Sequence, residues 1–170
     1  MKIHRPWLCL LTCLFFLGCF SQNSEAKELF GRTGIGYNAE FANTSLTNGV
    51  PAVSVKYGIA PRAAVELIAG FYSGNDGSGV FGLKFMPTLH SDPYANFYFL
   101  VGIGFVSAEH RNGTEFLTGF GAEFFIPGVD QVGISFETGM SAENLSAASG
   151  SFVLKTFGMS FINAGMHYYF

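Results

Sequence analysis

This chain of 170 residues has little charge, and its composition excludes two broad classes of protein. Only 12% of its residues are charged, against roughly 25% in an average protein. The net charge of −3 offers no basic patch for phosphates, which excludes a nucleic-acid binder. The twenty Phe and twenty-two Gly also argue against a soluble helical bundle, which is rich in Ala, Glu, Lys and Leu.

Cysteine is missing from most of the chain. The three cysteines, Cys9, Cys13 and Cys19, all lie near the start, in a segment that has the pattern of a secretory signal peptide. A basic region with Lys2 and Arg5 precedes an uncharged, mostly apolar stretch over residues 7–20 that is too short to span a bilayer as a helix.

Small residues before Lys27 predict cleavage after Ala26, so residues 1–26 form the signal peptide and residues 27–170 the mature domain. The mature chain then has no disulfide, thiol nucleophile or cysteine metal site. Two alternatives stay open. In the first, the segment stays uncleaved and serves as an anchor. In the second, the chain is processed as a lipoprotein at Cys19, because residues 16–19 resemble a lipobox in which Phe16 stands in place of the usual Leu.

Long apolar runs are absent after residue 27. The nearest, residues 93–108, is shorter than the roughly 18 residues of a spanning helix and carries Gly102 and Gly104. What recurs is an alternation of apolar and small or polar residues with a period of two, which is typical of strands with one apolar face. It predicts eight strands, over residues 32–41, 52–59, 64–72, 81–85, 96–105, 115–124, 132–139 and 162–170.

The 144 residues of the mature chain allow 18 for each strand with its connection. This fits spanning strands of about 9–11 residues. The predicted fold is all-β, an eight-stranded antiparallel up-and-down transmembrane β-barrel.

Charged residues share one face of these strands, and no charge falls on the apolar face of the first seven. An eight-stranded barrel has an interior only wide enough for side chains, too narrow to hold most of the strand Phe rings. Twelve glycines lie on the charged face, which suits a crowded interior. We therefore expect Phe outside in hydrocarbon and a lumen ion-pair network that fills the barrel, made by Arg32, Glu40, Lys56, Glu66, Lys84, Glu115, Glu123 and Glu137.

Aromatic residues and connections mark two rims. The predicted outer rim carries Phe41, Phe71, Phe81, Phe105 and Phe116, and the inner rim carries Tyr57, Tyr94, Tyr168 and Phe170. Inner connections are expected at residues 61–62, 86–93, with His90, and 126–130. They alternate with polar outer loops at residues 43–49, 73–79, 108–114 and 141–150.

The start of the last strand is ambiguous. The parity of Phe157, Met159 and Phe161 conflicts with that of Ile162 onward. Either a bulge lies near Phe161, which is the preferred interpretation because bulges are common in barrels, or the strand starts later. Lys155 is therefore assigned to neither face.

The chain ends on a Phe preceded by apolar residues at alternate positions, a pattern made by Ile162, Ala164, Met166, Tyr168 and Phe170. This looks like the C-terminal signal of bacterial outer-membrane barrels. With the predicted signal peptide and strands, the mature chain resembles the small outer-membrane β-barrel family that includes OmpX and the membrane domain of OmpA. The resemblance implies location in the bacterial outer membrane and assembly by the barrel-insertion machinery.

The expected role is structural or surface-interacting, not enzymatic, with neither cofactor nor metal. Expected partners are outer-membrane lipids including lipopolysaccharide, whose phosphates His110 and Arg111 would contact unless that loop is only solvated. One alternative is a lipid A-modifying enzyme, for which Ser107, Glu109, His110, Ser141 and Glu143 are loose candidates. Another is a secreted ligand carrier with an apolar lumen. An ion path through the lumen and the oligomeric state also stay open.

Overall fold

The structure is a computed structural model that describes residues 27–38, 41, 52–73, 77–108, 111–145, 151–156 and 162–170. The predicted signal peptide, its cleavage site and Cys19 lie outside these residues. The described part forms strands and connections without a helix. The strands are β1 (Thr33–Asn38), β2 (Ala52–Ala60), β3 (Ala63–Tyr72), β4 (Ser78–Asp92), β5 (Ala95–Ala108), β6 (Arg111–Ile126), β7 (Val129–Leu145), β8 (Ser151–Thr156) and β9 (Asn163–Tyr169).

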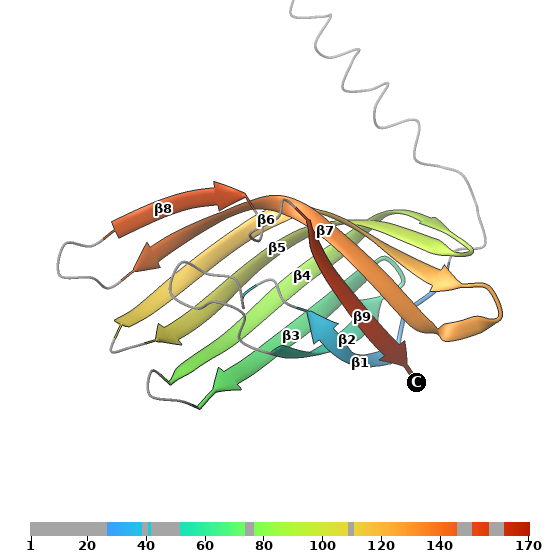
Figure 1. Cartoon of the computed structure of the whole chain (residues 1–170). Helices are drawn as coiled ribbons and strands as arrows, with labels where there is room; N and C mark the ends of the chain where they lie inside the picture. Colours follow the sequence, from blue (N-terminus) through green and yellow to red (C-terminus); the bar gives the residue numbers. More distant parts are fainter. Residues whose placement is uncertain are drawn as a thin grey trace, which may run out of the picture.

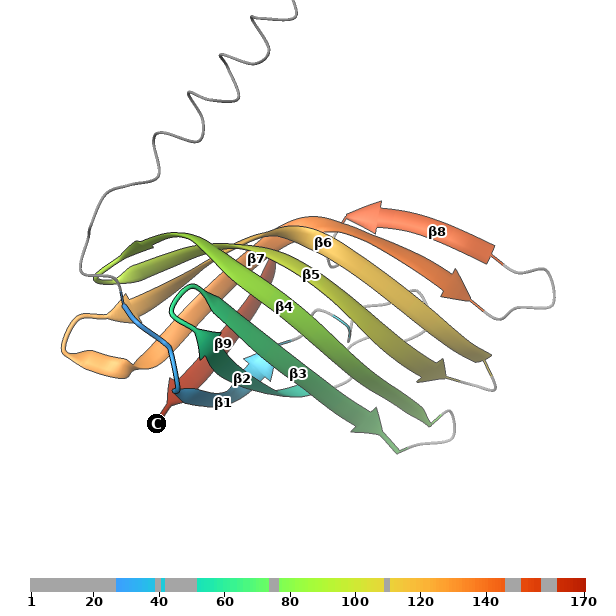
Figure 2. The same ribbon diagram turned by 180° about the vertical axis from the view of Figure 1, so that it is seen from behind.

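Eight of these strands close into an antiparallel barrel (Figures 1 and 2). Each strand from β1 to β7 pairs with the next, and β9 pairs with both β1 and β7. Closure gives each strand of the ring a partner on both sides, so the ring needs no exposed sheet edge. The predicted eight-stranded antiparallel barrel is confirmed.

Strand β8 continues the wall beyond β9. Both pair with the same edge of β7, β9 with Val132–Glu137 and β8 with Met140–Leu145. Figure 1 shows β8 beside the projecting end of β7. The last strand thus starts at Asn163, which agrees with the predicted later start. The bulge expected near Phe161 lies outside the described residues. The structure places Lys155 on the inner face, with ion-pair partners in the lumen.

The predicted inner connection at residues 86–93 is wrong. Strand β4 continues to Asp92, so His90 belongs to a strand, and the turn is at Pro93 and Tyr94. Pro87 is tolerated because it pairs with Ala63, the first residue of β3, where the ladder ends and the missing N–H costs least. The ladder with β5 shifts register between Thr88 and His90, a bulge that further relaxes the pairing.

Two predicted outer loops are also too long. Strand β5 runs to Ala108 and β6 starts at Arg111, while β7 runs through Ser141 and Glu143 to Leu145. Polar residues in these segments resemble a loop in sequence. They form strands because β6 and β7 pair as far as Gly113 and Leu145, and the polar side chains at 141 and 143 face the lumen.

The two faces of the wall have opposite chemistry. The side chains of Phe105 and Phe116 are each 54% exposed, whereas Lys84 is 0% and Glu66 1% exposed. Val101 and Leu83 lie on the outer face with the Phe rings. The expectation that rings point outward and charges inward therefore holds for these strands.

Phe41 is the exception among the predicted rim residues. Its ring is completely buried inside the barrel. Asn38, three residues earlier, also faces inward, and residues an odd number apart cannot share one face of a regular strand. The prediction that β1 continues to Phe41 with its ring outside is thus wrong.

Candidate functional site

A buried network of ionised and hydrogen-bonding side chains fills the middle of the lumen. Lys84 Nζ from β4 lies 3.0 Å from Glu66 Oε2 on the neighbouring strand β3 and 2.8 Å from Glu137 Oε2 on β7. The Tyr98 hydroxyl donates to Glu137 Oε1 at 2.8 Å. Asn38 Nδ2 donates to Glu137 Oε2 at 3.3 Å. One lysine thus links two carboxylates, and the hydrogen bonds offset part of the cost of burial.

A second ion pair lies nearer one end of the barrel. This end, where β2 turns into β3 and β6 into β7, is called the inner end, and the opposite end, where β3 leads into β4 and β5 into β6, is called the outer end. Lys56 Nζ is 2.8 Å from Glu123 Oε2, and the Tyr169 hydroxyl donates to Glu123 Oε1 at 2.6 Å. The ammonium also lies 4.9 Å from the centre of the Tyr98 ring. Tyr98 therefore contacts both ion pairs, through its hydroxyl and its ring.

His167 joins the Lys56–Glu123 pair to the network around Lys84, and the whole group is called the central network. Its Nε2 is 2.8 Å from Ser54 Oγ and 3.2 Å from Glu66 Oε1, and its Nδ1 is 3.8 Å from Glu123 Oε1. A hydrolase relay also combines a serine, a histidine and a carboxylate, but it holds the serine and the carboxylate at opposite nitrogens of the histidine ring. Here Ser54 Oγ and Glu66 Oε1 both lie at Nε2, and the Glu123 oxygen is too far from Nδ1 for a hydrogen bond. Ser54 is 0% and His167 1% exposed, so this arrangement is part of the packed lumen network.

A smaller ion cluster lies nearer the outer end. Lys155 from β8 forms an ion pair with Glu143 on β7, and its Nζ lies 3.9 Å from Glu115 Oε1 on β6. The two carboxylates are 1% and 3% exposed, whereas the lysine side chain is 23% exposed. The cluster ties β8 to the barrel in addition to the backbone ladder.

Glycines make room for the large inward side chains. A Cβ added to Gly121 would lie 2.5 Å from the Tyr98 ring, and one added to Gly34 would lie 2.7 Å from the Tyr169 ring. The glycine-rich inner face is therefore a packing feature: small residues on one strand accept the rings of another.

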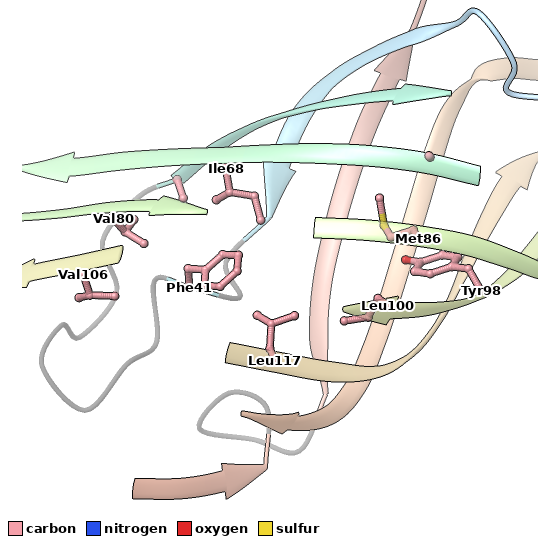
Figure 3. Packing of buried hydrophobic residues seen from close by; sticks show 10 residues of the cluster. Phe41, Ile68, Val80, Met86, Tyr98, Leu100, Val106 and Leu117 are labelled. Carbon is pink, nitrogen blue, oxygen red and sulfur yellow. The ribbon is translucent and has the colours of Figure 1, made fainter. Parts of the chain in front are cut away.

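An apolar layer lies between the central network and the outer end. Figure 3 shows the Phe41 ring between Ile68 and Leu117, with Val80 and Val106 further out. A Cβ added to Gly82 or Gly104 would come within 2.3 or 2.4 Å of the Phe41 ring. The ring therefore fills a space that exists because two adjacent strands carry glycine there.

The N-terminal part of the described chain covers the inner end. Lys27 Nζ is 3.1 Å from Asp130 Oδ1 and 5.3 Å from the centre of the buried Phe125 ring. Asn96 Nδ2 donates to the Lys27 carbonyl at 3.1 Å. The chain then crosses close to Gly58, where a Cβ would lie 1.9 Å from the Leu29 carbonyl oxygen. These contacts hold residues 27–30 against the barrel mouth.

Five of the eight predicted network residues meet in the central network: Lys56, Glu66, Lys84, Glu123 and Glu137. Glu115 belongs to the outer cluster. Arg32 lies apart at the inner end, its guanidinium 5.6 Å from the centre of the Tyr169 ring. Glu40 lies outside the described residues.

The sequence pattern does not identify every member of the two clusters. Glu143 falls in a predicted loop and Lys155 on neither predicted face, although both side chains face the lumen. His167 alternates with Tyr169, and both side chains are buried, so the alternation of the last strand is the signal that places His167 with the inward-facing charges.

The remaining predicted site residues lie on the outside or at the outer end. The large apolar side chains of the terminal pattern are exposed, from 50% for Tyr168 to 69% for Phe170. Ser107 Oγ donates to Asn112 Oδ1 at 2.8 Å, so this hydroxyl already has an acceptor. Arg111 begins β6, while Glu109 and His110 lie outside the described residues.

Comparisons of the chain with protein-family models, curated proteins and solved structures found no match. In the part of the chain that the structure describes, no helix is long and apolar enough to cross a membrane. Nor do three or more His, Cys, Asp or Glu side chains in that part come together as metal ligands would. The class of protein that the described geometry defines is a closed β-barrel with a polar, filled interior and an apolar exterior.

Proposed function

We propose that this chain is a bacterial outer-membrane β-barrel of the small type, with a filled lumen and a structural or surface-interaction role. The observation that carries the proposal is the inversion of the two faces. Apolar side chains such as Val53, Leu67, Phe120 and Phe136 are 46–61% exposed around the wall, while charged side chains in the middle of the strands, such as Lys84 and Glu66, are buried inside. In water this arrangement would leave a large apolar surface uncovered. In a bilayer the same surface contacts lipid, and a closed barrel satisfies its backbone there.

The filled lumen supports a role other than transport. The central network, the apolar layer around Phe41 and the N-terminal segment at residues 27–30 lie one after another between the two ends. An eight-stranded barrel has little space left once such side chains occupy it. The proposal therefore includes no pore. Contacts with lipid and with other molecules are assigned to the exterior wall and to the outer end, where Arg111 lies.

Membrane fractionation with an unheated gel tests the location. The mature protein is expected in the outer-membrane fraction, extracted only by detergent and migrating differently before and after boiling. Recovery as a soluble protein would overturn the proposal and favour a secreted carrier.

Planar-bilayer recordings test the filled lumen separately. We expect no stable single-channel conductance, whereas steady ohmic steps would contradict it.

A further inference from the structure

The space that the Phe41 ring fills has the features of a binding pocket. The ring is 0% exposed and contacts residues from several strands, with glycine at positions 82 and 104 directly against it. Ile68 and Leu117 supply branched apolar walls, as Figure 3 shows. All four of these neighbours are glycine or aliphatic, so the pocket is complementary to an uncharged ring.

The pocket adjoins an open cavity. A cavity of about 570 Å³ lies at the outer ends of β3 to β7, and its lining includes Val80, Val106, Gly70 and Gly113. Val80 and Val106 also belong to the buried cluster around Phe41. No charged side chain lines the cavity among the described residues. Volumes of 300–1,000 Å³ are typical of small-molecule sites. The cavity and the buried cluster around Phe41 therefore share these two valines as a boundary.

We propose that the lumen contains a binding site for a small uncharged molecule with a single apolar ring, and that Phe41 occupies this site as an internal ligand. The ligand would enter through the outer cavity and replace the Phe41 ring against Gly82 and Gly104. The entering ring would take over the pocket contacts of the Phe41 ring, at the cost of moving that ring out of its buried position, and the exchange breaks no ion pair of the central network. All residues of the site face the lumen, so this proposal does not depend on whether the barrel lies in a membrane.

Displacement has a measurable consequence for affinity. Because Phe41 competes with the ligand, the wild-type protein binds only in the fraction of molecules whose pocket is vacant. Removing the ring should therefore tighten binding without creating a new site. A Phe removed from the outer wall should have no such effect. Phe120 is the matched control because its ring is 58% exposed on the exterior of β6.

The experiment titrates 4-fluorotoluene into the barrel in lipid nanodiscs, followed by ¹⁹F NMR and by methyl NMR of labelled Val, Leu and Ile. Phe41→Ala is expected to bind saturably, at least tenfold more tightly than the wild type, with contacts from the ligand to the methyls of Val80, Ile68 and Leu117. The wild type should bind weakly at the same methyls, and Phe120→Ala should match the wild type. Phe41→Leu, which keeps more of the packing, should bind with intermediate affinity and serves if the alanine variant fails to fold.

Three results would overturn the proposal. Linear partitioning in every variant would mean that the ligand only dissolves in lipid. Equal saturable affinity of wild type and Phe41→Ala would place the site away from Phe41. Binding by Phe41→Ala with none by the wild type up to the solubility of the probe would mean that Phe41 is a permanent part of the core.

Discussion

The Lys84 ammonium lies 2.8 Å from a Glu137 carboxylate oxygen, and neither side chain is more than 1% exposed. The two residues belong to β4 and β7, which are not neighbours in the sheet. The pair therefore spans the lumen and connects parts of the wall that the backbone ladder does not join directly. Because the ammonium and the carboxylate lie in direct contact, their attraction offsets part of the cost of burying both charges in the lumen.

Replacing the lysine should destabilise the barrel strongly. In Lys84→Met the carboxylates of Glu66 and Glu137 lose their shared cation, and breaking a buried pair by removing one partner costs about 3–5 kcal/mol. Urea unfolding in detergent measures the free energy. Adding Glu137→Gln should recover part of the loss, because one uncompensated charge disappears. The matched control is Arg62→Met at an exposed inner turn, which should change stability by about 0.5 kcal/mol or less. A Lys84→Met variant as stable as this control would contradict a structural role for the network.

A methyl group at position 104 should be poorly tolerated. The Cβ of Gly104→Ala would lie 2.4 Å from the Phe41 ring, and overpacking of this kind costs about 1–3 kcal/mol. Gly79→Ala is the control in the neighbouring strand, since its nearest neighbour would be Gly70 O at 3.8 Å. Combining Gly104→Ala with Phe41→Leu should restore part of the stability. Additive losses in the double variant would show that the two residues do not touch.

A charge on the outer wall should report its depth in the bilayer. Val101→Arg, on the exterior face of β5, should cost about 2–4 kcal/mol if the residue lies near the midplane. Ser107→Arg lies on the same strand and face but six residues nearer the outer end, where the cost falls to about 0–1 kcal/mol. Unfolding titrations in lipid vesicles measure both. Equal costs at the two positions would be inconsistent with a hydrocarbon boundary between them.

The terminal aromatic residue should matter for assembly more than for stability. Phe170→Ser is expected to lower the yield of inserted protein in cells while leaving refolding into detergent near normal, because the side chain is 69% exposed. Its backbone N–H to Thr33 O bond, 2.9 Å long, does not depend on the ring. Tyr57→Ser, another exposed aromatic of the wall, should insert normally. Equal insertion yields for Phe170→Ser and Tyr57→Ser would remove the support for a C-terminal signal.

Alternation is enough to predict most strands and both faces, because a wall with a packed polar lumen on one side and an apolar exterior on the other imposes opposite chemistry on neighbouring residues. It failed where a local signal competed. Pro87 suggested the end of a strand, but it falls at the end of one ladder and costs little there. Glu143 suggested a solvated loop, although a lumen-facing carboxylate is equally polar in sequence.

Contacts across the lumen were beyond reach of the sequence. Tyr98 and Glu137 are hydrogen-bonded although 39 residues separate them. Their meeting depends on strand tilt and on stagger around the ring, which no single strand encodes. The burial of the Phe41 ring likewise depends on space left by glycines on other strands.

The most direct test of the whole account is the direction of two side chains at one depth. The only Trp of the chain, Trp7, lies in the predicted signal peptide, so single Trp probes are unambiguous in the mature protein. Tyr98 and Phe120 lie close together, since Tyr98 pairs with Gly121 and Phe99 with Phe120. One ring is buried in the lumen and the other is exposed outside. In vesicles with brominated lipid tails, Phe120→Trp fluorescence should be strongly quenched and Tyr98→Trp fluorescence barely changed. The reverse pattern, or equal quenching of both, would contradict a barrel that turns its rings to lipid and its charges inward.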